Sequence, residues 1–453
     1  MTTDLVLRPG VDSAFLAWRA PFIKNCRGFS LTRRVKRAAG STPSPETIKK
    51  GDDGFAIELV SSWVGFANGP KVDPGMRKTT TEWPIQKCTW SDFMVGPGDQ
   101  VAYRVAPMVG DADSLKEDAA NGSPWTDVVE IGATTRGGIS CYFNRGIVAS
   151  QWLSRLLPKA DPATELRQII ATPGDKTRNF LGGPVNDKLT SLLNNANHDG
   201  GHVFAALFEL DDPELIPLLQ ALGKRAHVLL GNGSVNHKGD DENAQARETL
   251  RMCDVHNRMT APRALAHNKF LVICDWHETP QVVRTGSTNW TMTGLCTQAN
   301  NAVLVQNALL AHDYLEQWKM LVECEDASPA SLLTSDATPL LIIEGDSDLA
   351  SQYAGNIMQI YNQYRWRQSV QAQHGKPAWE GLADDDKWQI GAPGSDPAYD
   401  KRRLRELDFW FGKPAGGQEA QDGAQMREAD GHPPRGEAGQ PSQHRRRQRG
   451  RGH

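Results

Sequence analysis

Two short polar clusters have the residue types that a phosphoryl-transfer site requires. His267 and Lys269 stand two residues apart at the start of the apolar run 270–274. Ser287 and Asn289 follow the next apolar segment of the chain. An imidazole can act as a nucleophile, an ammonium can neutralise a phosphate oxygen, and hydroxyl and amide groups can donate neutral hydrogen bonds. These residue types therefore indicate chemistry on a phosphate ester.

The apolar runs beside these clusters predict two antiparallel strands joined by a loop over residues 276–281. Side chains two residues apart on a strand point the same way, so His267 and Lys269 should share one face. The hairpin should return residues 286–289 to the same end of the sheet. A helix is expected to start near Asn289, where its N-terminus would favour an anion.

The spacing of these residues resembles the signature of the phospholipase D superfamily, which is His-x-Lys, a following Asp and a later Gly-Ser-x-Asn. The matching positions in this chain are His267, Lys269, Asp275, Gly286, Ser287 and Asn289. The following run Trp-Thr-Met-Thr-Gly-Leu at 290–295 is also similar to that family. The family usually has four residues between Lys and Asp, whereas five separate Lys269 from Asp275 here. In a regular strand this shift moves Asp275 to the other face.

The resemblance implies a reaction without metal or cofactor, in which His267 attacks phosphorus and forms a phosphohistidine. Lys269, Ser287 and Asn289 would bind the phosphate oxygens, and Asp275 would orient or tune the histidine. Members of the superfamily with one copy of the signature form homodimers, so we expect His267 of each subunit to contribute to one composite site. Alternatively, the general acid is another histidine of this chain, for which the candidates are His237, His198, His202 and His256.

Three functions are compatible with this pattern. The first is a phospholipase D-like phosphodiesterase, with a phospholipid preferred as its substrate. The second is a single-motif endonuclease that acts on DNA or RNA, with a basic groove lined by Lys224, Arg225, Arg258 and Arg263. The third is a binding module that keeps the fold but not the chemistry, which the altered spacing before Asp275 favours.

Composition places the chain among globular proteins. It has 453 residues, a net charge of −4 and an apolar fraction of 39%. The net charge implies no general affinity for polyanions. No run approaches the roughly 20 apolar residues of a membrane span, and the first residues lack a signal-peptide pattern, so we expect a cytoplasmic protein. The seven cysteines are scattered and odd in number, which favours free thiols over disulfides or a zinc site.

Composition also suggests four segments. Residues 1–133 show short alternating strands and loosely resemble a fibronectin type III sandwich, which would dock either to a protein partner or onto the catalytic domain. Residues 134–180 are expected to be a connector, in which Asn144 and Arg145 follow a short strand. Residues 181–412 should form the catalytic α/β domain. Residues 413–453 have almost no apolar residues and a basic end, and they should be a disordered tail.

Within the α/β domain, strands and helices should alternate, which predicts a mixed sheet flanked by helices. Expected helices span 186–196, 213–223, 242–252, 308–323 and 348–370. Beside the motif hairpin, expected strands span 202–210, 226–231, 301–306 and 339–343.

Overall fold

The computed structural model describes most of the chain. The described residues are 3–39, 47–51, 53–70, 76–133, 137–149, 153, 156–158, 160–233, 241–260, 265–324, 341–372 and 381–412. The expected tail, His237 and Arg263 lie outside these ranges. The chain divides into two compact units, 1–397 and 398–453. The second unit is described only over its first residues, which belong to helix α10 (Pro397–Trp410).

The N-terminal part of the chain consists mainly of antiparallel strands. One sheet has the order β1-β2-β8 and another the order β10-β9-β3-β5-β4, with β11 also paired to β9. The long central strand is β3 (Cys26–Lys36), which pairs with β9 (Gln100–Val109) along most of its length. The other strands are β1 (Asp4–Pro9), β2 (Ala14–Arg19), β4 (Thr47–Lys50), β5 (Ala56–Leu59), β6 (Ser61–Ser62), β7 (Lys78–Thr79), β8 (Thr89–Asp92), β10 (Lys116–Glu117) and β11 (Val129–Glu130).

A buried charge network joins strands of both sheets in this part. The Arg33 guanidinium, which is almost fully buried, forms ion pairs with Glu58 and Asp92. The Tyr103 hydroxyl donates to the same Asp92 carboxylate at 2.8 Å. Because a buried charge is tolerated only when it is paired, this network constrains the pairing of the strands.

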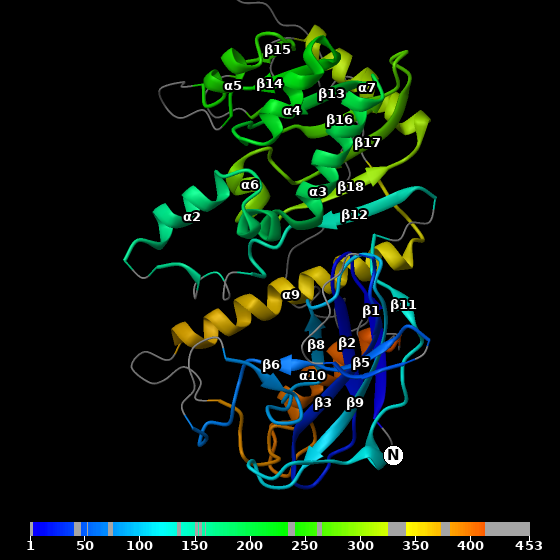
Figure 1. Ribbon diagram of the computed structural model, residues 1–453, viewed down its shortest axis with the longest axis vertical. Helices are drawn as coiled ribbons and strands as arrows, with labels where there is room; N and C mark the ends of the chain where they lie inside the picture. Colours follow the sequence, from blue (N-terminus) through cyan, green and yellow to red (C-terminus); the bar gives the residue numbers. More distant parts are fainter. Residues whose placement is uncertain are drawn as a thin grey trace, which may run out of the picture. The chain divides into compact units, whose positions relative to one another are not determined.

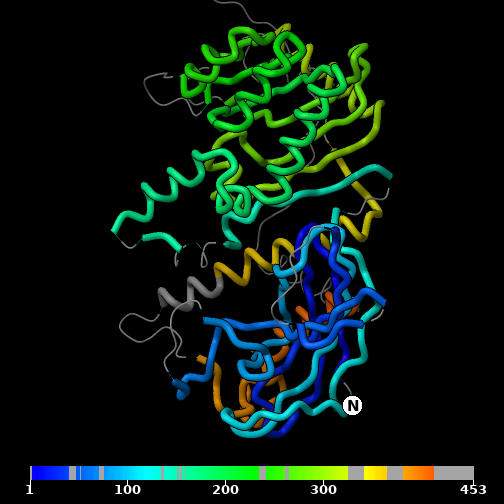
Figure 2. The backbone as a smooth tube through the Cα atoms, in the orientation of Figure 1, coloured from blue at the N-terminus to red at the C-terminus, as the bar shows by residue number. Residues whose placement is uncertain are grey.

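The α/β part is built on one seven-stranded sheet with the order β12-β18-β17-β16-β13-β14-β15 (Figures 1 and 2). The strand β16 (Lys269–Cys274), which follows His267, is therefore the central one. Strands β13, β14 and β15 run parallel to one another, and the other neighbours are antiparallel. The remaining bounds are β12 (Ile139–Phe143), β13 (His202–Leu207), β14 (Ala226–Gly231), β15 (Asp254–Arg258), β17 (Pro280–Gly286) and β18 (Asn301–Val305).

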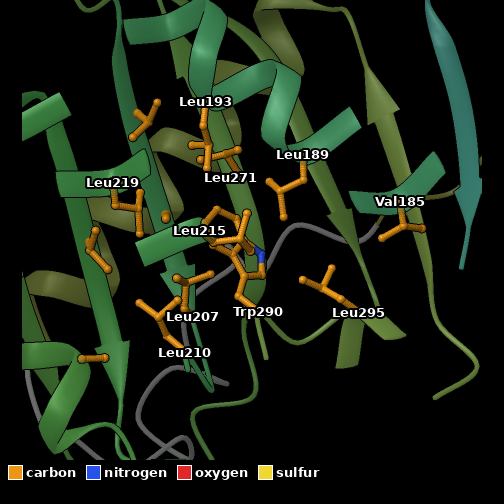
Figure 3. Close-up of a cluster of buried hydrophobic side chains, with 14 of the residues drawn as sticks. Val185, Leu189, Leu193, Leu207, Leu210, Leu215, Leu219, Leu271, Trp290 and Leu295 are labelled. Atoms are coloured by element: carbon orange, nitrogen blue, oxygen red, sulfur yellow. The ribbon is translucent and has the colours of Figure 1, made fainter. Parts of the chain in front are cut away.

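Helices cover both faces of this sheet. Leu207 and Leu271 point to one face, where they pack under α3, α4 and α6 together with Trp290 (Figure 3). Phe270 and Val272 point to the other face and pack under α7. The helices are α2 (Pro162–Ile170), α3 (Lys176–His198), α4 (Leu215–Leu222), α5 (Ala244–Thr249), α6 (Met292–Cys296), α7 (Ala308–Glu323) and α9 (Ser347–Ala372), with short 3-10 turns η1 (Ala119–Asn121) and η2 (Gly223–Arg225). Within the described ranges, no helix combines the length and apolarity needed to cross a bilayer.

Several boundaries differ from the sequence expectations. The sheet begins at β12, inside the expected connector, because this strand pairs with β18 along its whole length. Residues 381–397, expected in the catalytic domain, lie against the N-terminal strands instead. There the Trp388 indole packs on Phe29 with ring centroids 5.9 Å apart and donates to the Cys26 carbonyl at 3.0 Å.

Three further segments differ from the expected list. The edge strand β15 was not expected, since its sequence Asp-Val-His-Asn-Arg is mostly polar. Residues 341–343, the described part of an expected strand, have no regular structure. The helix expected near Asn289 starts at Met292 and has only five residues, with the Thr291 side chain as its N-cap. It therefore supplies little dipole to the site.

Burial of the central strand predicts a large stability effect at Leu271, which is 0% exposed. Leu271→Ala should lower the free energy of unfolding by about 2–5 kcal/mol, because it removes buried methyl groups and leaves a cavity. Urea denaturation would measure the change. Leu309→Ala is the matched control, since that leucine is 81% exposed on α7, and its effect should stay within about 0.5 kcal/mol. Equal effects of the two substitutions would contradict the central position of β16.

Candidate active site

His267 and Lys269 converge on one aromatic ring. Lys269 opens β16 opposite Leu207, the last residue of β13, and the backbone amide of Phe208 donates to the Asn268 carbonyl at 2.8 Å. The His267 ring meets the Phe208 ring edge-on with centroids 4.7 Å apart. The Lys269 ammonium lies 4.9 Å from the centroid of the same ring. The two residues therefore sit together at the carboxyl end of β13, as the sequence predicts.

The end of β17 comes next to Lys269. Leu271 pairs with Arg284, so Lys269, two residues earlier, is level with Gly286, two residues later on the antiparallel neighbour. A side chain at Gly286 would place its Cβ only 2.4 Å from the Asn301 carbonyl oxygen. Only glycine, which has no Cβ, allows β18 to approach the end of β17 this closely.

Ser287 is exposed and tied to the start of β18. Its hydroxyl donates to the Asn300 side-chain oxygen at 3.0 Å and accepts from the Asn301 backbone amide at 3.0 Å. These bonds fix the turn that leads to Asn289. Ser287 therefore lies in the loop of the site, with its hydroxyl engaged by the neighbouring asparagines.

Asn289 reaches the site through a second connection. The Trp290 carbonyl accepts hydrogen bonds from the amides of Asp211 and Asp212, both at 3.2 Å, which holds the loop beside the segment that follows β13. The Asn289 amide nitrogen then donates to a Glu209 carboxylate oxygen at 2.8 Å. The Asn289 side-chain oxygen is buried and has no hydrogen-bond partner among the described residues.

Glu209 is a site residue that the sequence analysis missed. It lies two residues after the end of β13, its carboxylate accepts from the Asn289 amide, and its charge raises the pKa of Lys269. The signal was present in the sequence as the first of three carboxylates that follow the apolar run 203–208. No spacing rule links that position to a motif about sixty residues later, so only the fold brings the two together.

Burial tunes both titrating groups of the site in the same direction. It lowers the pKa of Lys269 from 10.5 to about 8, with Glu209 acting against the shift. The pKa of His267 lies below its usual 6.5. Partial burial is the main cause, and the charge of Lys269 is the second. At neutral pH the histidine is therefore mostly unprotonated, while the lysine still carries its charge. A neutral imidazole beside a cation is the combination that attack on a phosphate diester requires.

Asp275 does not join this group. It follows β16 at the end opposite to Lys269. With the rise per residue of an extended strand, the two residues are about 20 Å apart. Its carboxylate accepts from the amides of His277 at 2.9 Å and Thr279 at 2.8 Å, and these bonds lower its pKa. The structure therefore places Asp275 in the hairpin turn, where it holds backbone amides and does not reach His267.

The described histidines proposed as the general acid also lie elsewhere. His198 ends α3, and His202 pairs with Cys274, so both are at the far end of the sheet. His256 lies on β15, three strands and about 14 Å from β16.

The described basic residues proposed for a groove are engaged at other places. Lys224 and Arg225 precede β14 at the far end of the sheet and donate to the backbone carbonyls of Cys253 and Gly201. Arg258 is buried at the edge strand β15, where it donates to the Leu321 carbonyl at 3.4 Å.

Asn144 and Arg145 have structural partners too. The Asn144 amide donates to the Leu295 carbonyl at 2.8 Å, which anchors α6. Arg145 forms an ion pair with Asp12 at 2.6 Å. An arginine after a short strand could contact a phosphate, but the ion pair with Asp12 gives Arg145 a structural role.

The buried charge of Lys269 should cost stability. Lys269→Met should raise the free energy of unfolding at pH 7 by about 1–3 kcal/mol, because methionine needs no desolvation of an ammonium. The folded state loses the proton near pH 8 and the unfolded state near 10.5, so the wild type gains stability between these values. The difference in the free energy of unfolding between Lys269→Met and the wild type should therefore become smaller as the pH rises from about 8 to 10.5. Urea denaturation at pH 7 and pH 9.5 measures it, and a less stable variant at pH 7 would contradict the burial cost.

Comparison with known proteins gives limited matches. No family model matches the chain, and no curated protein matches it. Among solved structures, Nuc of Salmonella typhimurium, a phospholipase D family member, is 18% identical with a TM-score of 0.26, covering 32% of this chain and 93% of that one. NucT of Helicobacter pylori is 14% identical with a TM-score of 0.25, over 30% and 89%. Yeast tyrosyl-DNA phosphodiesterase is 12% identical with a TM-score of 0.18, over 25% and 27%.

Proposed function

We propose that this chain is a metal-independent phosphodiesterase of the phospholipase D type, with His267 as its nucleophile. The observation that carries the proposal is the arrangement around Phe208, where a neutral imidazole and a buried ammonium contact the same ring. Asn289, held through Glu209, adds a neutral amide to the same end of the sheet. Nucleophile, cation and neutral donor are the groups that diester cleavage through a covalent intermediate requires.

In the first step one imidazole nitrogen of His267 attacks phosphorus, a P–N bond forms and the P–O bond to the leaving group breaks. Lys269 and the Asn289 amide hold the non-bridging oxygens, whose charge must be stabilised in the transition state. In the second step water attacks phosphorus and the P–N bond breaks, which returns His267. Ser287 supports this arrangement by fixing the loop that carries Asn289.

The leaving oxygen needs a proton in the first step, and the attacking water must lose one in the second. The described histidines that the sequence suggested as donors lie away from Lys269, which supports a donor from a second copy of the chain. We therefore propose a homodimer in which His267 of the second subunit gives and then recovers this proton. In this scheme each site depends on both subunits.

A phospholipid is the preferred substrate class. The described basic residues that would have lined a nucleic-acid groove donate to backbone carbonyls, and Lys224 and Arg225 lie at the far end of the sheet, which supports a lipid over a polyanion. Cleavage of DNA or RNA by a single-motif endonuclease is the alternative. A silent binding module would keep Lys269 and Asn289 for phosphate binding but show no turnover.

Hydrolysis of bis(p-nitrophenyl) phosphate in EDTA tests the reaction. The wild type should turn over, and His267→Ala should abolish the activity because no covalent intermediate can form. Lys269→Ala and Asn289→Ala should each lower kcat/KM by about 10²–10³, the usual loss when one charge-stabilising group is removed. His312→Ala is the matched control, since that imidazole is exposed on α7, and it should keep full activity.

The outcomes separate the three functions. EDTA-resistant turnover that His267→Ala retains would rule out the proposed nucleophile. A folded wild type that binds phosphodiesters without turnover would identify the binding module. Phosphatidylcholine vesicles and single-stranded DNA, compared at equal phosphate concentration, then decide between the lipid and the nucleic-acid substrate.

The pKa values of the free site predict a bell-shaped pH profile of kcat/KM. The acid limb should lie below pH 6.5, where His267 becomes protonated, and the alkaline limb near pH 8, where Lys269 loses its charge. Glu209→Gln should move the alkaline limb to lower pH, because the carboxylate that raises the pKa of Lys269 is gone. An alkaline limb that stays in place in this variant would show that Glu209 does not act through Lys269.

A further inference from the structure

A second cluster of chemistry-bearing side chains lies at the opposite end of the sheet from His267. His202 opens β13, His227 lies near the start of β14, and Glu278 lies in the turn between β16 and β17. The ligand atoms of these three residues lie within 4.8 Å of one another. Among the described histidine, cysteine and carboxylate side chains, they form the one group that is close enough to share a metal ion. The three residues are far apart in the sequence, which is why no metal motif could be read from it.

The distances match the edges of a metal polyhedron. The His202 Nδ1 atom lies 3.1 Å from His227 Nε2 and 3.4 Å from a Glu278 carboxylate oxygen. Two ligands of a tetrahedral zinc ion, each about 2.0–2.1 Å from the metal, are about 3.3 Å apart. One ion can therefore contact all three atoms with small side-chain movements.

A carboxylate behind His227 sets the state of its ring. The Asp254 carboxylate lies 2.6 Å from His227 Nδ1, so that nitrogen carries the proton and donates it. The other nitrogen, Nε2, then accepts the hydrogen bond from His202 Nδ1 at 3.1 Å, and a metal ion between the two rings would take the place of that proton. A ligating histidine whose second nitrogen donates to a carboxylate is the usual arrangement at protein metal sites. The Phe204 ring stacks on His227 at 4.2 Å and holds the imidazole plane.

The turn that carries Glu278 contains an unfavourable backbone conformation. Glu278 has a φ of +61°, a left-handed conformation that glycine or asparagine usually occupies. The Asp275 carboxylate stabilises this turn through its bonds to the amides of His277 and Thr279. On the other side, a side chain at Gly201 would place its Cβ 2.5 Å from the Cys274 carbonyl oxygen, so glycine is required for β13 to start this close to the turn. A strained residue kept at such a position points to a functional side chain.

We propose that His202, His227 and Glu278 bind one divalent transition-metal ion of the zinc class. Two imidazoles and one carboxylate are ligands that Zn²⁺ accepts, and the exposure of Glu278 leaves a fourth position for water. The ion would clamp the β16–β17 turn onto the starts of β13 and β14. Because the cluster lies at the far end of β16, the ion takes no part in the reaction proposed for His267.

The test is metal binding by the full-length chain after EDTA treatment and dialysis. Isothermal titration with zinc chloride should give one site per chain, and the Tm should rise when zinc is added. His227→Gln should weaken binding at least tenfold, and Asp254→Asn should weaken it about tenfold through the second nitrogen of His227. His312→Gln is the control histidine on α7 and should bind as the wild type does.

Glu278→Gly separates metal binding from folding. Glycine suits the left-handed turn, so the metal-free variant should be folded and have a Tm at least as high as the metal-free wild type. It should nevertheless bind zinc at least tenfold more weakly and lose most of the Tm increase on zinc addition. A wild type without a zinc site, or unchanged zinc affinity in both His227→Gln and Glu278→Gly, would overturn the proposal. Neither result depends on phosphodiesterase activity.

Discussion

The burial of β16 is the constraint on which both ends of the α/β part depend. This strand has three others on each side and helices on both faces, so its six residues have one possible register. A slip by one residue would move Leu271 from the cluster around Trp290 to the face under α7 and disrupt the packing on both faces. Because the strand cannot slip, Lys269 is fixed against Phe208 at one end. Asp275 is fixed in its turn at the other end.

The rigid packing of this hairpin holds two cationic side chains in buried positions, where desolvation disfavours their charged forms. Lys269 is desolvated at the start of β16, with the Glu209 carboxylate as partial compensation. Arg284, opposite Leu271 on β17, is also fully buried, and burial lowers its pKa to about 10. Its Nη2 atom has no hydrogen-bond partner in the described part of the chain. A loosely packed sheet would let water reach such groups, whereas the central position of this hairpin keeps Lys269 poised near neutral pH.

Apolar periodicity predicted the elements whose own residues show a strong helix or strand pattern. The strand β14 and the helix α7 have the expected bounds, and the hairpin places His267, Lys269, Ser287 and Asn289 at one end of the sheet. The edge strand β15 was missed because an edge needs little apolar surface, and its polar residues Asp254 and His256 hide the strand pattern. Glu209, His227 and Glu278 were missed for a different reason. Their roles depend on which strands become neighbours, and strand order is not a local property of sequence.

The position of Asp275 changes the meaning of the five-residue spacing after Lys269. In a regular strand that spacing moves the aspartate to the other face, which favoured a silent binding module. Asp275 lies beyond the strand, however, and its carboxylate bonds to turn amides, so its distance from Lys269 does not alter the geometry around His267. The β-bulge between the pairs of Ile273 and Cys274 lies beside this turn, and the pairing of β16 with β17 is regular from Ile273 to Leu271. The unusual spacing is therefore a property of the turn, and it gives no reason to expect a loss of chemistry at the other end of the strand.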